Sequence, residues 1–284
     1  MPMYSIKEML YKAQAERYAV PAFDVSNLEF VRSVVEVAEE ERSPVILMVV
    51  PPDAEAALPY LVSLAKAASE NVSVPLALHL DHSPSFELCQ KAIEAGFTSV
   101  MFDGSSLPFD ENVAITKRVV EYAHARGVSV EAELGHVGKA ETAEGEQADV
   151  TQLTGPEDVK RFVELANVDA LAVSIGTAHG IYTSLPQLDI PRLKKIRSIT
   201  SVPLVLHGGS DTPDDQVKEA IANGITKLNI FSELCVAMVE GLQEFLATNK
   251  KKAPWPIEIF EKPMTKMREV VRRKIHLCGS SGKI

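Results

Sequence analysis

The sequence predicts an α/β fold in which eight parallel strands, each followed by a helix, close into a single (β/α)8 (TIM) barrel. Short apolar runs rich in Val, Ile and Leu recur along the 284 residues, and each is followed by a longer helical pattern. This alternation is typical of parallel strands joined by helical crossovers. Eight such units, spaced by about 25 to 35 residues, favour a barrel over an open sheet. A doubly wound sheet should carry a glycine-rich dinucleotide fingerprint in its first turn, and none follows Phe23.

The expected elements follow one another along the whole chain. An amphipathic helix over residues 1–18 precedes the first strand. The eight strand and helix pairs are expected at Tyr18–Phe23 and Asn27–Glu41, Pro44–Val50 and Leu58–Ser69, Pro75–Asp81 and Ser85–Ala95, Ser99–Asp103 and Glu111–Arg126, Ser129–Leu134 and Pro156–Leu165, Ala170–Ile175 and Ile190–Ser198, Pro203–His207 and Asp214–Asn223, and Lys227–Ile230 and Glu233–Ala247. Beyond them, residues 255–284 form a C-terminal extension with a helical pattern over Lys262–Ile275. No change of composition marks a boundary, so residues 1–284 are expected to form one domain.

Composition and charge exclude several classes of function. The net charge is −10, and such an acidic balance argues against nucleic acid or an anionic membrane as the main partner. The three cysteines form no CxxC pair, which is consistent with free thiols in a reducing compartment. No apolar run approaches the length of a membrane span, and the first residues do not form a signal peptide. We therefore expect a soluble, cytoplasmic protein.

Histidines and carboxylates gather where the predicted strands end, which is where such barrels place their active sites. His82, His179 and His207 follow the third, sixth and seventh strands, and three imidazoles are typical of a catalytic zinc site with an open position. Asp81 directly precedes His82. Because side chains alternate along a strand, Asp81 and His79 are expected on one face and His82 on the other. His79 lies deeper and is expected to support the site or to pack.

Glycine-rich segments follow the last two strands. Gly208, Gly209 and Ser210 allow backbone N–H groups to approach an anion, and residues 229–232 open the last helix of the barrel. Barrels of this kind commonly bind a phosphate there. The alternative is a pair of tight turns in which glycine supplies a positive φ.

Six segments together resemble the class II, zinc-dependent ketose-bisphosphate aldolases. They are LHLDHS (78–83), VMFDGS (100–105), VEAELG (130–135), IGTAHGIY (175–182), LVLHGGSD (204–211) and LNIFSEL (228–234). The resemblance extends from AVPAFDVSNLE (19–29) to MREVVRRKIHLCGS (267–280) and is strongest to the branch that includes tagatose-1,6-bisphosphate aldolase.

This resemblance implies a role for each matching residue. The divalent cation, Zn²⁺ in this family, would be held by His82, His179 and His207, with Asp103 and Glu133 offering an alternative or second metal position. Asp81 matches the acid-base residue for the oxygen that becomes the C4 hydroxyl, and Glu141 matches a glutamate that moves the proton at C3. The segments that hold dihydroxyacetone phosphate match Gly180, Gly208, Gly209, Ser210, Asn229, Ile230, Phe231 and Ser232. The family also implies a homodimer or homotetramer, with a monovalent cation or an accessory subunit in some members.

The implied reaction is reversible cleavage of tagatose- or fructose-1,6-bisphosphate to dihydroxyacetone phosphate and glyceraldehyde 3-phosphate. A Lewis acid stabilises the resulting enediolate, and a carboxylate takes the C4 hydroxyl proton, so no Schiff-base lysine is required. Lys227 is then expected to be structural or electrostatic. Asp24, Met48–Val50 and Phe231 depart from the family pattern, as does the pair at residues 139–140. A variant aldehyde partner therefore stays open, as does a non-catalytic sugar-phosphate-binding or regulatory subunit. A barrel isomerase or epimerase explains Asp81 less directly.

Overall fold

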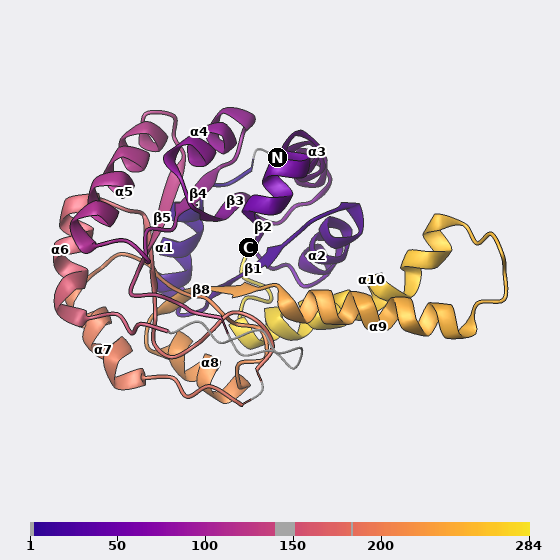
Figure 1. Ribbon diagram of the computed structural model, residues 1–284. Helices are drawn as coiled ribbons and strands as arrows, with labels where there is room; N and C mark the ends of the chain where they lie inside the picture. Colours follow the sequence, from indigo (N-terminus) through magenta and orange to yellow (C-terminus); the bar gives the residue numbers. More distant parts are fainter. Residues whose placement is uncertain (1–2, 140–150, 183) are drawn as a thin grey trace.

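The computed structural model describes residues 3–139, 151–182 and 184–284 and contains a closed barrel of eight parallel strands (Figure 1). The strands pair in chain order, and β1 closes the barrel on β8. They are β1 Val20–Asp24, β2 Val45–Val49, β3 Leu76–Ser83, β4 Ser99–Phe102, β5 Ser129–Leu134, β6 Ala170–Val173, β7 Leu204–Leu206 and β8 Ile225–Ile230. The predicted fold class is confirmed.

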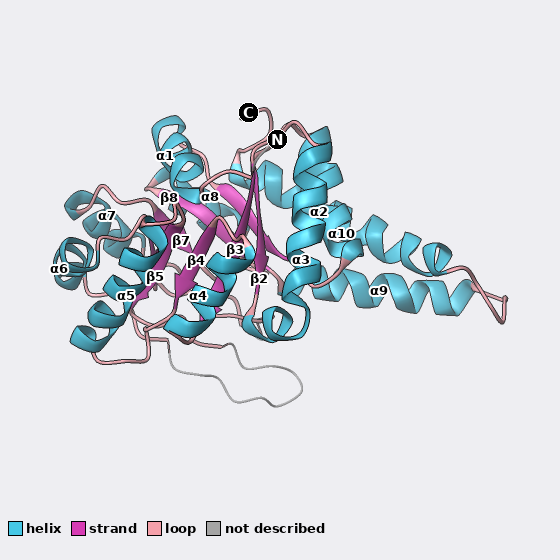
Figure 2. Ribbon diagram, turned by 90° about the horizontal axis from the view of Figure 1, so that it is seen from above, coloured by secondary structure: helices cyan, strands magenta, loops and turns pink. Residues whose placement is uncertain are grey.

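Helices surround the barrel in the order expected from the sequence (Figure 2). Their bounds are α1 Ile6–Glu16, α2 Leu28–Glu40, α3 Pro51–Asn71, α4 Phe86–Ala95, α5 Phe109–His124, α6 Pro156–Ala166, α7 Ile190–Ile199, α8 Asp214–Ala222, α9 Ser232–Thr248 and α10 Pro256–Cys278. None of the helices within the described ranges is long and apolar enough to cross a membrane.

Two helices begin six or more residues earlier than the sequence pattern predicts. The helix expected from Leu58 begins at Pro51, because proline suits the first turn of a helix, and a kink at Ala57 separates this turn from the rest. The extension helix expected over Lys262–Ile275 runs from Pro256 to Cys278. It pairs with α9, and the two helices together project from the barrel (Figures 1 and 2).

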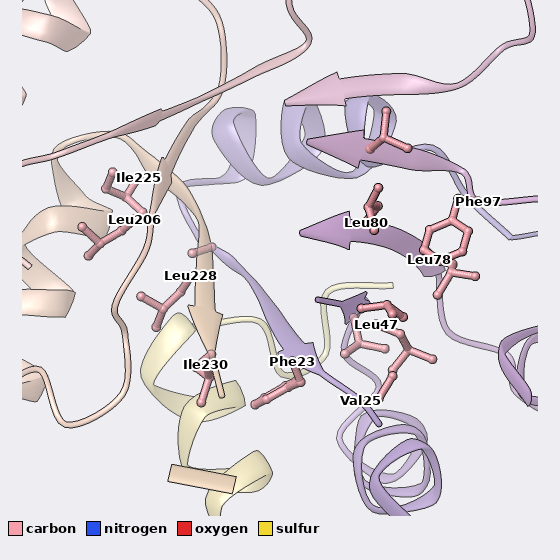
Figure 3. Close-up of a cluster of buried hydrophobic side chains, with 14 of the residues drawn as sticks. Phe23, Val25, Leu47, Leu78, Leu80, Phe97, Leu206, Ile225, Leu228 and Ile230 are labelled. Atoms are coloured by element: carbon pink, nitrogen blue, oxygen red, sulfur yellow. The ribbon is translucent and has the colours of Figure 1, made fainter. Parts of the chain in front are cut away.

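The apolar core has two layers, because the strands are buried on both faces. Outward-facing residues such as Leu47, Leu78 and Leu228 pack against the helices, and Figure 3 shows part of this outer layer. A smaller inner cluster joins Ala22 and Ala77 of the strands to the apolar face of α1, including Leu10. Helix α1 therefore closes the barrel at the end where the strands begin. The polar residues of the interior lie toward the opposite end.

Candidate active site

The end of β3 departs from regular strand geometry at His82. This residue has a φ of 47°, and the pairing of β3 with β4 shifts register between Leu80 and Ser83. A left-handed conformation costs a residue with a side chain roughly 1–2 kcal/mol. As a result His82 turns toward the same site as Asp81, with 3.8 Å between Asp81 Oδ2 and His82 Nε2. The expectation from strand alternation that these two residues lie on opposite faces is wrong.

The three predicted metal-binding histidines converge on one point. His82 Nε2 lies 3.2 Å from His179 Nε2 and 2.9 Å from His207 Nδ1. Tetrahedral Zn²⁺ with Zn–N bonds of about 2.0–2.1 Å places its ligand nitrogens roughly 3.3 Å apart. The nitrogen positions therefore fit a small divalent cation without a large rearrangement.

Carboxylates orient two of these rings through their outer nitrogens. His82 Nδ1 lies 2.7 Å from Asp103 Oδ2, and His207 Nε2 lies 2.8 Å from Glu131 Oε1. Such partners fix the imidazole tautomer and turn the other nitrogen toward a metal. Asp103 is thus placed to support His82 as well as to serve as an alternative ligand.

The protonation of the three rings is unequal. Burial alone would lower the pKa of His82, but Asp81 and Asp103 outweigh it and raise the pKa to about 10. Burial and the charge of His82 lower the pKa of His179 to about 4. The same two causes lower the pKa of His207 well below its usual value. Two rings are therefore neutral, which is the form that binds a metal.

Glu133 supplies a further oxygen beside the three histidines. Its Oε1 accepts a hydrogen bond from the Val137 backbone N–H at 2.8 Å, while Oε2 has no hydrogen-bond partner among the described residues. This oxygen lies 3.7 Å from His207 Nδ1. Burial and the charge of Asp103 raise the pKa of Glu133 to about 8. With His82 and Asp103, Glu133 forms a second group of potential metal ligands within 4.8 Å of one another.

Beneath the histidines lies a buried ion pair to which the sequence assigned no catalytic role. Glu131 Oε2 accepts a hydrogen bond from Lys227 Nζ at 2.8 Å, and both side chains are fully buried. His79 lies 3.7 Å from the same oxygen and bonds Ser99 Oγ through Nδ1 at 2.8 Å. Lys227 is thus an electrostatic partner of Glu131, as expected. Glu131, for which the sequence predicts no role, holds His207 through its other oxygen at 2.8 Å.

Asp81 on β3 is held by the side-chain amide of a residue on β8, the strand that closes the barrel on β1. Asn229 Nδ2 on β8 donates to Asp81 Oδ1 at 3.2 Å and to Oδ2 at 3.3 Å. Asp24, at the end of β1, is buried close by, and burial together with the charge of Asp81 raises its pKa well above the usual value. Of Asp24 and Asp81, only Asp81 therefore has an amide donor on both carboxylate oxygens among the residues the structure describes.

The expected phosphate-binding residues also lie around this site. A cavity of about 540 Å³ contacts Asp81, His82 and His179 as well as most of the expected segment residues, namely Gly180, Gly208, Ser210, Asn229, Ile230, Phe231 and Ser232. Gly209 does not line the cavity, because its N–H donates to the Asn229 carbonyl at 2.9 Å. Ser210 Oγ accepts from the N–H groups of Phe231 and Glu233 at 3.2 and 3.4 Å, at the start of α9.

Two residues outside the expected set hold these turns in place. Lys274 on α10 is buried and donates to the Gly209 carbonyl at 2.9 Å, while also pairing with Glu233 at 2.5 Å. The Tyr182 hydroxyl accepts from the Ala178 N–H at 2.8 Å. A lysine within an amphipathic helix gives no signal that it reaches a turn 65 residues away. Glu141 lies outside the described residues.

The comparisons with known proteins agree with this geometry. The family model of class-II fructose-bisphosphate aldolase matches residues 4–283. The chain belongs to the class-II fructose-bisphosphate aldolase family. The crystal structure of the YdjI aldolase from Escherichia coli K12 is 33% identical, with a TM-score of 0.87, and the match covers 100% of this chain and 99% of that one.

Two further solved structures are similar over nearly their whole length. A putative fructose-1,6-bisphosphate aldolase from Coccidioides immitis is 31% identical with a TM-score of 0.88, covering 97% of this chain and 96% of that one. Fructose-bisphosphate aldolase from Campylobacter jejuni is 22% identical with a TM-score of 0.79, covering 100% and 97%, and this likeness shows the fold alone. The protein is an aldolase, and its family is metal-dependent.

Proposed function

We propose that this aldolase reversibly cleaves a ketose carrying phosphate on C1 into dihydroxyacetone phosphate and an aldehyde, with Zn²⁺ as its divalent cation. The observation that supports this proposal most directly is the convergence of the nitrogens of His82, His179 and His207 beside the carboxylate of Asp81. The resemblance in sequence suggests tagatose- or fructose-1,6-bisphosphate as the substrate. Both sugars carry the required C1 phosphate.

The residues present fit a zinc ion. Three imidazole nitrogens form the ligand set, two rings are oriented by carboxylates, and Glu133 Oε2 is a buried oxygen with no partner in the described part of the chain. When bound, the cation supplies Lewis-acid stabilisation of the negative charge that develops on the substrate oxygens. Asp103 and Glu133 are proposed as the alternative or second position for the metal.

Asp81 is proposed to act as the acid-base residue. In the cleavage direction its carboxylate takes the proton of the C4 hydroxyl, the C3–C4 bond breaks, and C4 becomes the aldehyde carbon while the electron pair stays on C3. Asn229 keeps the carboxylate turned toward this oxygen. A proton must then reach C3, and Glu141 is the proposed donor. In condensation each proton moves in the opposite sense.

The C1 phosphate is proposed to bind where α9 begins. Gly180, Gly208 and Ser210 contribute one wall there, and the N–H groups of Phe231 and Ser232 lie at the positive end of the helix dipole. Two nearby N–H groups, those of Phe231 and Glu233, donate to Ser210 Oγ. A phosphate oxygen can replace Ser210 Oγ as their acceptor. Phosphate binding at this end fixes the direction in which the rest of the sugar extends.

The test follows one product that every candidate sugar shares. Fructose 1-phosphate, fructose-1,6-bisphosphate and tagatose-1,6-bisphosphate are each supplied, and dihydroxyacetone phosphate is measured by a coupled dehydrogenase. Exchange of the C3 hydrogen of dihydroxyacetone phosphate in D2O is followed in parallel by NMR. We expect exchange, and release from at least one sugar, that EDTA abolishes and Zn²⁺ restores. Chelator-insensitive turnover contradicts the metal role, and absence of both reactions favours a non-catalytic sugar-phosphate-binding subunit.

A further inference from the structure

The two ends of the cavity differ in the groups that they present. The end near β7 and β8 offers glycine turns and the start of α9. The other end lies over β1 and β2, where the lining consists of the Asp24 carboxyl group and the apolar side chains of Val50, Pro51 and Pro52. A ligand that fills the cavity therefore meets hydrogen-bond donors at one end and a carboxyl group within an apolar wall at the other.

The end over β1 and β2 has no lysine or arginine among its described lining residues. The single lysine or arginine in the described lining of the cavity is Lys139. It is exposed and follows β5, where its backbone bridges to His179. In a ring of eight strands paired in chain order, β5 lies opposite β1. Lys139 is thus placed across the cavity from Asp24.

Negative charge accumulates at the same end. Asp24 is 3% exposed, and its Oδ1 has no hydrogen-bond partner in the described ranges. Burial and the charges of Asp81 and Asp53 raise the pKa of Asp24, and they outweigh the opposite effect of His82 and Lys227. A phosphate group placed here would face the carboxyl groups of Asp24 and Asp81, which both line the cavity, and like charges brought together in a desolvated site repel one another strongly. A hydroxyl group can instead satisfy Asp24 whether this residue is ionised and accepts, or is protonated and donates.

The direction of the substrate follows from the proposed function, on which this inference rests. The proposed function places the C1 phosphate at the start of α9 and the C4 oxygen at Asp81. The sugar carbons from C5 onward must then extend beyond Asp81, away from the phosphate. Asp81 is bonded to Asn229 of β8, and β8 pairs with β1, which carries Asp24. The remaining open part of the cavity is the end over β1 and β2. The aldehyde half of the sugar lies there.

We propose that the aldehyde partner of this enzyme is a hydroxyaldehyde without a terminal phosphate, so that the substrate class is the ketose 1-phosphates, and that Asp24 selects it by hydrogen bonding a hydroxyl of the aldehyde half. The apolar Val50, Pro51 and Pro52 cover the carbon skeleton of this half. Asp24 is then a specificity-determining residue that disfavours a second phosphate.

The primary test compares two aldehydes that differ only in the phosphate. The zinc-loaded enzyme condenses dihydroxyacetone phosphate with D-glyceraldehyde or with D-glyceraldehyde 3-phosphate, and kcat/KM is measured for each. L-Glyceraldehyde and its 3-phosphate form a second pair. We expect kcat/KM to be higher for the unphosphorylated member in at least one pair, by about tenfold or more. Equal or higher values for the phosphorylated member in both pairs would overturn the inference.

Exchange of the C3 hydrogen separates this inference from the proposed function. The C3 hydrogen of dihydroxyacetone phosphate exchanges in D2O without any aldehyde. The exchange rate therefore does not depend on the part of the cavity over β1 and β2. Exchange together with a preference for the phosphorylated aldehydes overturns the inference and leaves the aldolase assignment in place. Absence of both exchange and condensation overturns the proposed function, and the inference with it.

A matched pair of variants tests Asp24 itself. Asp24→Asn removes the carboxyl charge but keeps the size of the side chain. Asp53→Asn is the control, because Asp53 is bonded to Ser26 Oγ at 2.6 Å and does not line the cavity. We expect Asp24→Asn to raise the ratio of kcat/KM for the phosphorylated over the unphosphorylated aldehyde by about tenfold, and Asp53→Asn to raise it by less than about threefold. An unchanged ratio in Asp24→Asn, or equal shifts in both variants, would overturn the role of Asp24.

Discussion

Replacing Lys227 with methionine should strongly destabilise the barrel. The Lys227 ammonium group and the Glu131 carboxylate are 2.8 Å apart, and both side chains are fully buried. Methionine fills similar space but leaves Glu131 with two imidazoles, the His207 ring bonded at 2.8 Å to its other oxygen and His79 Nε2 at 3.7 Å, and with no ammonium group. Removing one partner of a buried ion pair typically costs about 3–5 kcal/mol, because the remaining charge is uncompensated. We expect the free energy of unfolding to fall by about this amount.

The assay is urea unfolding followed by circular dichroism, on Lys227→Met, Glu131→Gln and the double variant. The double variant removes both charges, so it should be more stable than the sum of the single changes predicts, by about 1–3 kcal/mol. Glu131→Gln should also weaken Zn²⁺ binding by about 10–100-fold, because it alters the partner of His207. A Lys227→Met protein within about 1 kcal/mol of the wild type, or strictly additive effects, would refute the reasoning.

Three further outcomes are expected. Asp81→Asn should keep Zn²⁺ but lower kcat by about 10²–10⁴-fold, as measured by release of dihydroxyacetone phosphate, and near-normal turnover would contradict the acid-base role. Zn²⁺ at about 100 times its Kd should stabilise the protein by about 2.7 kcal/mol and raise its Tm, whereas His179→Ala should lose both this shift and turnover; an equal Tm shift in the variant would contradict the site. For Glu233, burial alone would raise the pKa, but Lys274 outweighs it and holds the pKa below the usual 4.5. This pair therefore stabilises the fold above pH 4.5, and its contribution is lost as the pH falls below that value. The difference in unfolding free energy between wild type and Glu233→Gln should shrink on acidification. A difference that grows would contradict the assignment.

The sequence was sufficient to predict the fold and to group most residues of the proposed site, because both rest on local patterns. Apolar runs followed by amphipathic helices specify a parallel barrel, and the topology then brings every strand end to one face. For this reason His82, His179 and His207 could be grouped although up to 125 residues separate them. Residue type and position at a strand end carried the information, and no long-range contact had to be inferred.

The remaining features depend on contacts that no local pattern contains. The left-handed backbone at His82 arises from a one-residue shift between β3 and β4, and an alternating pattern reads the same with or without such a shift. The partnership of Glu131 with His207 and Lys227 crosses the interior between strands that are not neighbours in sequence. Lys274 reaches Gly209 only because α10 folds back onto the barrel. In each case the partner is chosen by tertiary packing.

These buried groups also explain why the site can select a cation at all. Five carboxyl groups surround the histidines, and the buried ammonium group that pairs with one of them is that of Lys227. They are Asp24, Asp81, Asp103, Glu131 and Glu133. Fixed carboxylates in a region of low dielectric attract a divalent cation more strongly than they would in water. The same excess of negative charge acts on a substrate. Under the proposed function a single phosphate is acceptable at the start of α9, where backbone N–H groups face it, whereas over β1 and β2 the described lining offers the carboxyl group of Asp24 and no lysine or arginine. The electrostatics proposed to hold the metal would therefore also make the two ends of the cavity unequal toward phosphate.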